Sequence, residues 1–183
     1  MAGVDVRSAV EADLAALAHL NLTYPTRRVL SLERTGVPPE VTFSFRWNAT
    51  EPRELLYAEY PEERLLGALD RVDLFLAASI DEQPCGLLMI MLPTYTDAGE
   101  ITDLAVDRAH RRQGVAGALL GAAIEWATAR SLRALWVEPR ADNEDAIEFY
   151  IGRGFRLSGF NDRLYSNADH EDGRPTLYMH LQL

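Results

Sequence analysis

The feature that most constrains the fold is one segment in which a strand, a turn and a helix of small residues follow one another. Glu100 to Val106 reads as a β-strand, and residues 114–130 repeat their apolar positions with helical spacing. That helix is rich in alanine and glycine, which allows very close packing on a sheet. The segment therefore predicts an α/β domain in which helices flank a central sheet.

The elements around this segment support the same fold class. Strands are expected at residues 74–80, 86–95, 132–137, 155–165 and 176–183. The turn at residues 81–84 joins the first two of these strands into a hairpin. A strand running into a helix is expected between Val4 and Leu22, and a second-half helix at 143–153 ends at Gly154. The order of elements predicts a mixed, mostly antiparallel sheet.

Residues 23–66 give the weakest pattern, because five prolines interrupt them. Only Val41 to Trp47 alternates apolar and polar residues, which predicts one half-buried strand. We interpret the region as a proline-rich insert with a single strand. The whole length of 183 residues is typical of one domain.

The charges exclude several classes of chemistry. The chain has 28 acidic and 18 basic residues and a net charge of −10. All the basic residues are arginine, so a lysine Schiff base and a Walker-type phosphate loop are both excluded. Nucleic acid is not an expected partner, because neutralising phosphates dominates that affinity. The acidity favours a cationic substrate. Alternatively, the excess of acidic residues only keeps the protein soluble.

The chain is expected to be cytoplasmic and not to contact a membrane. Its longest apolar run is too short to span a bilayer, and its N-terminus does not resemble a signal peptide. The single cysteine, Cys85, cannot form an internal disulfide and is expected to be a small buried residue. The four histidines (His19, His110, His170 and His180) lack metal-ligand spacing, so no metal site is predicted.

The turn that opens the central helix predicts an anion site. Helix N-terminal amides have no partners within the helix and carry the positive end of its dipole, which suits a pyrophosphate. Two arginines add charge beside them. Alternatively, the small residues serve packing and the arginines are solvated. The residues concerned are Arg111, Arg112, Gln113, Gly114, Val115, Ala116 and Gly117.

Two ordered motifs resemble a known family. The pattern R-x-x-G-x-A at 111–116, after a strand ending in Leu104, Ala105 and Val106, looks like the acetyl-CoA motif of GNAT-type N-acetyltransferases. The pattern N-x-x-A-x-x-F-Y at 143–150, followed by Gly154, is similar to the family's next motif. Segments 101–106, 136–138, 159–165 and 177–179 resemble streptothricin (nourseothricin) acetyltransferases, which usually have a glutamate at the position of Thr102.

The resemblance implies a fold, a co-substrate and a set of binding residues. It implies a GNAT-like fold with a splayed pair of parallel strands, in one N-acetyltransferase domain over 1–183 with 23–66 on the acceptor side. Acetyl-CoA would be the co-substrate, without a metal. Its pantetheine arm would pair with the backbone of residues 104–106 and with Asn143, in a motif that includes Ala146. Its pyrophosphate would bind residues 112–117, and Tyr150 would stand beside the thioester sulfur.

The chemistry needs a base and an acid. An amine with a pKa of about 10.4 is neutral only about one part in a thousand near pH 7.4, so a carboxylate has to take its proton. Strand alternation predicts Glu100 on one face and Asp103 on the other. We favour Asp103 and Glu138 as bases over Glu100, and Tyr150 as the acid for the thiolate. Tyr165 is expected either to line the amine site or to pack in the core.

The function that this implies is acetyl transfer to a primary amine of a small cationic molecule, by direct attack in a ternary complex. A streptothricin-like antibiotic is one such acceptor, which would make the protein a resistance enzyme. Two alternatives stay open: a protein or peptide acetyltransferase acting on an N-terminus or lysine, and a non-catalytic CoA-sensing module. A homodimer is also left open. Trp136 and the last strand could form its interface, but they could equally belong to the hydrophobic core.

Overall fold

The computed structural model describes residues 3–166 and 175–183, and the chain forms two compact units. Unit 1 comprises residues 1–23, 56–136 and 182–183, and unit 2 comprises residues 24–55 and 137–181. The expectation of one domain with an acceptor-side insert stays a prediction. No helix in these described ranges is long and apolar enough to cross a membrane.

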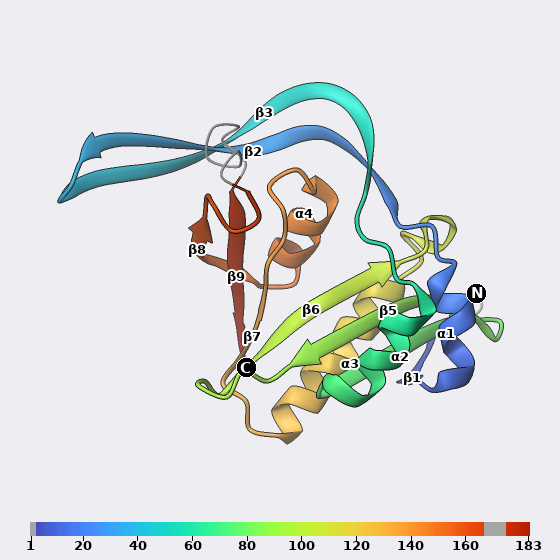
Figure 1. Cartoon of the computed structure of the whole chain (residues 1–183). Helices are drawn as coiled ribbons and strands as arrows, with labels where there is room; N and C mark the ends of the chain where they lie inside the picture. The colour runs from blue at the N-terminus through green and yellow to red at the C-terminus, as the bar shows by residue number, and fades with distance from the viewer. Residues whose placement is uncertain (1–2, 167–174) are drawn as a thin grey trace. The chain divides into compact units, whose positions relative to one another are not determined.

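Unit 1 contains a mixed sheet with helices on both faces (Figure 1). Its strands lie in the order β1-β4-β5-β6-β7, all antiparallel except the parallel pair β6–β7, so the predicted fold class is confirmed. The elements are β1 (Asp5–Ser8), α1 (Glu11–Ala18), α2 (Glu62–Arg71), β4 (Leu74–Ile80), β5 (Gln83–Met91), β6 (Ala98–Val106), a 3-10 turn (Arg108–His110), α3 (Val115–Ala129) and β7 (Ala134–Val137), whose last residue belongs to unit 2.

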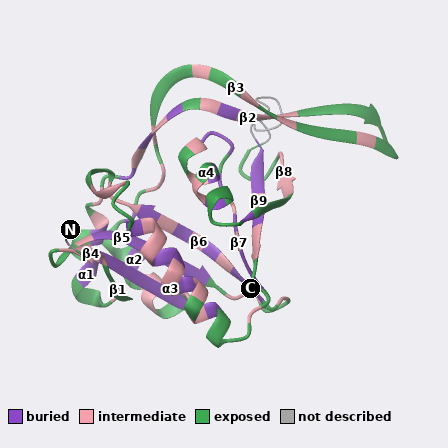
Figure 2. Cartoon of the chain, turned by 180° about the vertical axis from the view of Figure 1, so that it is seen from behind, coloured by how far each residue is buried: buried purple, intermediate pink, exposed green. Residues whose placement is uncertain are grey.

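The core of unit 1 lies against its central strands, which are largely buried (Figure 2). On one face, Phe75 and Met89 join Leu14 and Leu17 of α1 and Leu65 of α2 in one apolar cluster. On the other face, the position of Gly86 lies against two residues of α3, where an added Cβ would come within 3.0–3.2 Å of the Val115 and Leu119 side chains. Helix α3 thus packs closely on the sheet at Gly86, through Val115 and Leu119. That its alanines and glycines permit this packing stays a prediction.

The first predicted hairpin is present with the expected turn. Asp81 and Glu82 both have positive φ, as a two-residue turn between antiparallel strands requires. Cys85 at the start of β5 is fully buried, and burial raises the pKa of its thiol. This matches the interpretation of Cys85 as an inert core residue.

Unit 2 contains a long two-stranded ribbon, a helix and a hairpin. The ribbon strands are β2 (Thr23–Val37) and β3 (Glu40–Leu56), and they are followed along the chain by α4 (Glu144–Gly152), β8 (Arg156–Asn161) and β9 (Thr176–Gln182). Helix α4 ends as predicted, with Gly154 in the left-handed region at φ +91°. Strands β8 and β9 pair antiparallel; residues 167–174 of the linker expected between them, and with them His170, lie outside the described residues.

The prediction of a single strand within residues 23–66 is wrong. The region holds both ribbon strands and the start of α2. The ribbon turns at residues 38–39. Gly36, just before the turn, has φ +87°, and a Cβ there would stand 2.2 Å from the carbonyl oxygen of Glu40. Most ribbon residues outside the first half of β2 are exposed on both faces, so apolar alternation marks only residues 41–47, which belong to β3.

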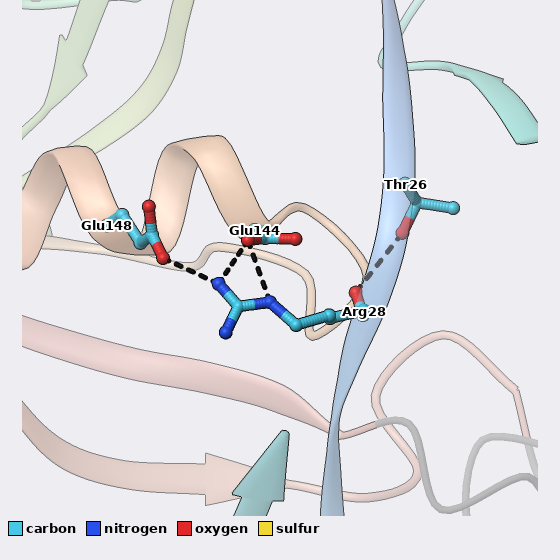
Figure 3. A network of polar contacts seen from close by, with 4 residues as sticks. All are labelled: Thr26, Arg28, Glu144 and Glu148. Carbon is cyan, nitrogen blue, oxygen red and sulfur yellow. Dashed lines mark hydrogen bonds and ion pairs between the residues drawn. The ribbon is translucent and has the colours of Figure 1, made fainter. Parts of the chain in front are cut away.

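Polar contacts join β2 to α4 within unit 2 (Figure 3). The Arg28 guanidinium donates to Glu144 through Nε at 2.9 Å and to Glu148 through Nη2 at 2.8 Å. Its carbon also lies 5.0 Å from the ring centroid of Trp47 on β3. One arginine therefore ties both ribbon strands to the first turns of α4.

Candidate active site

The turn between β6 and α3 has the backbone of an anion-binding site. Arg112 has φ +64° and Gly114, the N-cap of α3, has φ +90°. Left-handed residues within a turn direct successive backbone N–H groups into one concavity, and here that concavity meets a helix N-terminus. The structure thus brings the predicted residues 111–117 together at one helix start. Within it Val115 is buried, and Ala116 and Gly117 are partly exposed.

Side chains hold the entry to this turn. Asp107 accepts hydrogen bonds from the amides of Ala109 at 2.9 Å and Asn21 at 2.8 Å. Burial tends to raise the pKa of Asp107, but these bonds and His110 outweigh it and leave the pKa lowered. Arg111 donates through Nε to the carbonyl oxygen of Val106 at 3.2 Å. Arg111 is therefore fixed beside the end of β6, whereas Arg112 is exposed.

The end of β6 extends past its parallel neighbour. The amide of Arg133 donates to the carbonyl of Asp97 at 2.9 Å, which aligns the start of β7 with the start of β6. Since β7 has four residues and β6 has nine, β7 ends beside about residue 102. The backbone of Leu104, Ala105 and Val106 lies beyond that point, where an extended ligand could add to the edge.

A bulge in β6 changes which side chains share a face. Asp103 pairs with Met89 and Ile101 pairs with Ile90, so one extra residue, Thr102, is inserted. The extra residue reverses the alternation. Glu100, opposite Met91, thus lies on the same face as Asp103, so the expectation that they lie on opposite faces is wrong.

Asp103 is a buried carboxylate held by α2 and the segment before it. It is 8% exposed and accepts a hydrogen bond on Oδ1 from the hydroxyl of Tyr60. Arg64 Nη2 lies 3.7 Å from the same oxygen, and its guanidinium carbon lies 4.7 Å from the Tyr60 ring centroid. Burial raises the pKa of Asp103, while the hydrogen bonds from Tyr60 and Thr102 and the charge of Arg64 oppose that rise.

In unit 2, the second motif forms the start and the core face of α4. The side chain of Asn143 caps the helix by accepting from the amide of Ala146 at 3.2 Å. Tyr150 is 5% exposed and its ring packs edge-on against Phe149 and Phe155, with centroids 5.3 and 5.1 Å away. The motif residues thus have structural roles of their own. Binding to a cofactor would add to those roles.

The second candidate base, Glu138, lies near the start of the second segment of unit 2 and is more open than Asp103. Its Oε2 accepts a hydrogen bond of 3.3 Å from the hydroxyl of Tyr165. Burial raises the pKa of Glu138, and the Tyr165 hydrogen bond acts against the rise. Tyr165 is 64% exposed, so of the two expectations for it, core packing is wrong.

Tyr60 and Arg64 were not predicted from the sequence as residues of the site. They lie about forty residues before Asp103, in the region where no helix was expected. Pro61 followed by two glutamates, which is typical of a helix N-terminus, was the available signal for a helix here. Within the described residues, no group of three or more His, Cys, Asp and Glu is arranged to hold a metal.

Comparison with known proteins places the chain in a family. The model of the acetyltransferase (GNAT) family matches residues 36–155, about two thirds of the chain. The chain belongs to the GNAT acetyltransferase family. It is therefore an N-acetyltransferase, and acetyl-CoA is its acetyl donor.

Three matches extend over nearly the whole acetyltransferase. Streptothricin acetyltransferase of Streptomyces lavendulae is 26% identical over 185 residues, covering 96% of this chain and 93% of that protein. The crystal structure of nourseothricin acetyltransferase has a TM-score of 0.79 and 25% identity, with 98% of each chain covered. A Bacillus anthracis acetyltransferase solved with acetyl coenzyme A has a TM-score of 0.82 at 19% identity, covering 99% of this chain and 100% of that chain.

The residues of the acetyltransferase fit the demands of acetyl-CoA. The left-handed turn before α3 offers backbone donors and arginines suited to a diphosphate. No side chain fills the space above Gly114, since an added Cβ there would have no neighbour within 4 Å. The β6 backbone beyond β7 suits an amide-containing arm. Buried Asp103, on the same strand, supplies a carboxylate close in sequence to these groups.

Proposed function

We propose that this acetyltransferase transfers the acetyl group to a primary amine of a small cationic molecule of the streptothricin type. The similarity to streptothricin acetyltransferase over 96% of the chain carries the proposal. The net charge of −10 supports it, because an acidic protein attracts cationic acceptors. Acetylation of such an antibiotic would make the protein a resistance enzyme.

The proposed binding residues are those of the turn, of the end of β6 and of the second motif. Backbone amides of residues 112–117 would hold the pyrophosphate, with charge from Arg111 and Arg112. The backbone of residues 104–106 would hold the pantetheine arm, together with the Asn143 side-chain amide. Acetyl-CoA supplies an acetyl group activated as a thioester, and these residues fix its position.

The proposed base is Asp103, with Glu138 as the second candidate. The acceptor binds as an ammonium ion and has to lose a proton before its nitrogen can attack the thioester carbon. A carboxylate that is deprotonated at neutral pH accepts that proton, directly or through one water. Asp103 has the stronger support, because a hydrogen bond and a nearby cation favour its charged form despite burial.

Tyr150 is the proposed acid. When the carbon–sulfur bond breaks, the sulfur leaves as a thiolate, and the Tyr150 hydroxyl would donate a proton to it. A thiol has a pKa of about 8.5, so this donation is worth on the order of tenfold to a thousandfold in rate. The carboxylate passes the first amine proton to solvent. The nitrogen loses its second proton as the amide forms, and the Tyr150 phenolate regains one, so that the net products are the amide, the CoA thiol and one proton.

An amine panel with free-thiol detection tests the acceptor. Purified protein and acetyl-CoA are mixed with streptothricin, simple diamines, an aminoglycoside, and peptides with a free N-terminus or a lysine. We expect release of CoA thiol and acetylated product with streptothricin in preference to the rest. Turnover of peptides alone would replace the proposal with a protein acetyltransferase. Tight binding of acetyl-CoA without turnover on any amine would indicate the non-catalytic module.

A further inference from the structure

We propose that Tyr60 and Arg64 are positioning residues that keep the Asp103 carboxylate oriented and ionised for its role as the acceptor's base. The inference rests on the proposed function, since it takes Asp103 as that base. Tyr60 immediately precedes the N-cap of α2 and Arg64 lies in its first turn, so one short segment supplies both groups. They meet Asp103 on the face of the sheet that α1 and α2 cover.

Tyr60 and Arg64 act on one oxygen of the Asp103 carboxylate. The Tyr60 hydroxyl and Arg64 Nη2 both approach Oδ1 of Asp103. Burial raises the pKa of the Tyr60 phenol far above its ordinary value, with Tyr57 and Asp103 adding to the rise. Tyr60 therefore keeps its proton at every relevant pH and acts only as a hydrogen-bond donor. The two groups together therefore hold Oδ1 of Asp103 in place.

Arg64 also supplies a positive charge near Asp103. A buried carboxylate without compensation becomes protonated, since burial disfavours the charged form. The Arg64 guanidinium is too far from Oδ1 for a direct hydrogen bond, at 3.7 Å, and its side chain is 53% exposed. It stacks on the Tyr60 ring, so the hydrogen-bond donor also holds the cation in place. The two residues thus act as one unit on Asp103.

Other charged groups on the same elements do not replace Arg64. On α1, Asp13 is paired with Arg7 through contacts of 2.6 and 2.7 Å, and Glu11 and His19 are exposed. Around the start of α2, three exposed acids (Glu59, Glu62 and Glu63) add only negative charge. On β6 itself, Glu100 shares the face of Asp103 and adds no positive charge. Arg64 is the cation whose charge favours the ionised form of Asp103.

The test is the pH dependence of kcat/KM in Tyr60→Phe and Arg64→Met, with Arg64→Lys as the conservative variant. We expect the acid limb of the plot of kcat/KM against pH to move to higher pH in the first two variants, by roughly half to one pH unit. Neighbouring donors and partly exposed cations change a carboxyl pKa by about that much. Above the limb, kcat/KM should return to within about threefold of the wild type. Arg64→Lys should restore most of the shift.

Arg71→Met is the matched control, since Arg71 lies in the last turn of the same helix. It should leave the limb unchanged. The second readout is a titration of the Asp103 carboxyl by carbon-13 NMR in each variant. If the limb and the titration both stay at the wild-type pH in Tyr60→Phe and Arg64→Met, the inference is wrong while the proposed function stands.

Failure of the proposed function gives a different result. In that case the wild type acetylates no amine in the panel, and the carbon-13 titration alone decides the inference. If the measured pKa of Asp103 rises in both variants, but not in Arg71→Met, the positioning role is supported even though no activity is measured. A titration that does not move overturns it.

Discussion

The two units each carry one candidate base, and they hold it in different ways. Asp103 of unit 1 is almost fully buried, accepts a hydrogen bond from a buried phenol and has a guanidinium nearby. Glu138 of unit 2 is partly exposed and has one long hydrogen bond from Tyr165, which is itself exposed. Burial raises the pKa of both carboxyls. The difference lies in the groups that oppose the rise, and a base needs such groups to remain charged.

The largest expected effect separates the two carboxylates directly. Asp103→Asn should lower kcat/KM by about 10²–10⁴-fold, the usual contribution of a positioned general base. Glu138→Gln should lower it by less than about tenfold, because water can take over a partly exposed role. Steady-state kinetics with acetyl-CoA and the best acceptor measure both.

Acetyl-CoA affinity by calorimetry serves as the control and should stay near the wild-type value in both variants. The reverse order of losses would transfer the role of base to Glu138.

The second effect concerns the acid in unit 2. Tyr150→Phe keeps the buried ring and its edge-on contacts with Phe149 and Phe155, and removes only the hydroxyl. We expect kcat to fall by on the order of tenfold to a thousandfold, with acetyl-CoA affinity nearly unchanged. Tyr95→Phe is the matched control, since Tyr95 is 85% exposed. A loss of affinity in Tyr150→Phe would contradict the role of acid.

The third effect concerns the backbone of unit 1. Gly114→Val places a β-branched residue at φ +90°, a conformation that costs an ordinary residue about 1–2 kcal/mol and a β-branched one more. No neighbour obstructs the new side chain, so the effect comes from the backbone alone. We expect the turn to change shape and acetyl-CoA affinity to fall by about tenfold or more.

The control for that variant lies in the same helix. Gly121→Ala in α3 also has no neighbour within 4 Å of the new Cβ, and its backbone is helical. It should leave affinity unchanged and raise stability by about 0.5–1 kcal/mol. Equal affinities in Gly114→Val and the wild type would show that the turn does not bind the cofactor.

Sequence reasoning succeeded where local signals agree with the fold. The strand Leu74–Ile80 was predicted with its correct bounds, because a buried strand leaves a short apolar run that turn residues end. Gly154 and Gly114 both marked helix termini, and both have the positive φ that glycine tolerates best. These features depend on the residues of one segment and its immediate neighbours.

It failed where structure depends on partners distant in the sequence. The ribbon strands are mostly exposed on both faces, so apolar alternation marks only residues 41–47 of β3. The bulge at Thr102 has no glycine or proline to reveal it and appears only in the register with β5. The contact of Tyr60 with Asp103 spans 43 residues, and no local pattern records it.

The smallest expected effect tests the weaker carboxylate. Tyr165→Phe removes the hydroxyl that donates to Glu138 and that opposes the burial-driven rise in its pKa. The pKa of Glu138 should therefore rise further. If Asp103 is the base, this rise leaves the acid limb of kcat/KM against pH in place, and activity changes by less than about threefold. If Glu138 is the base, it is protonated, and therefore inactive, up to a higher pH than in the wild type. The acid limb then moves to higher pH. Because the variant alters Glu138 and leaves every contact of Asp103 intact, an upward shift would assign the proton transfer to unit 2.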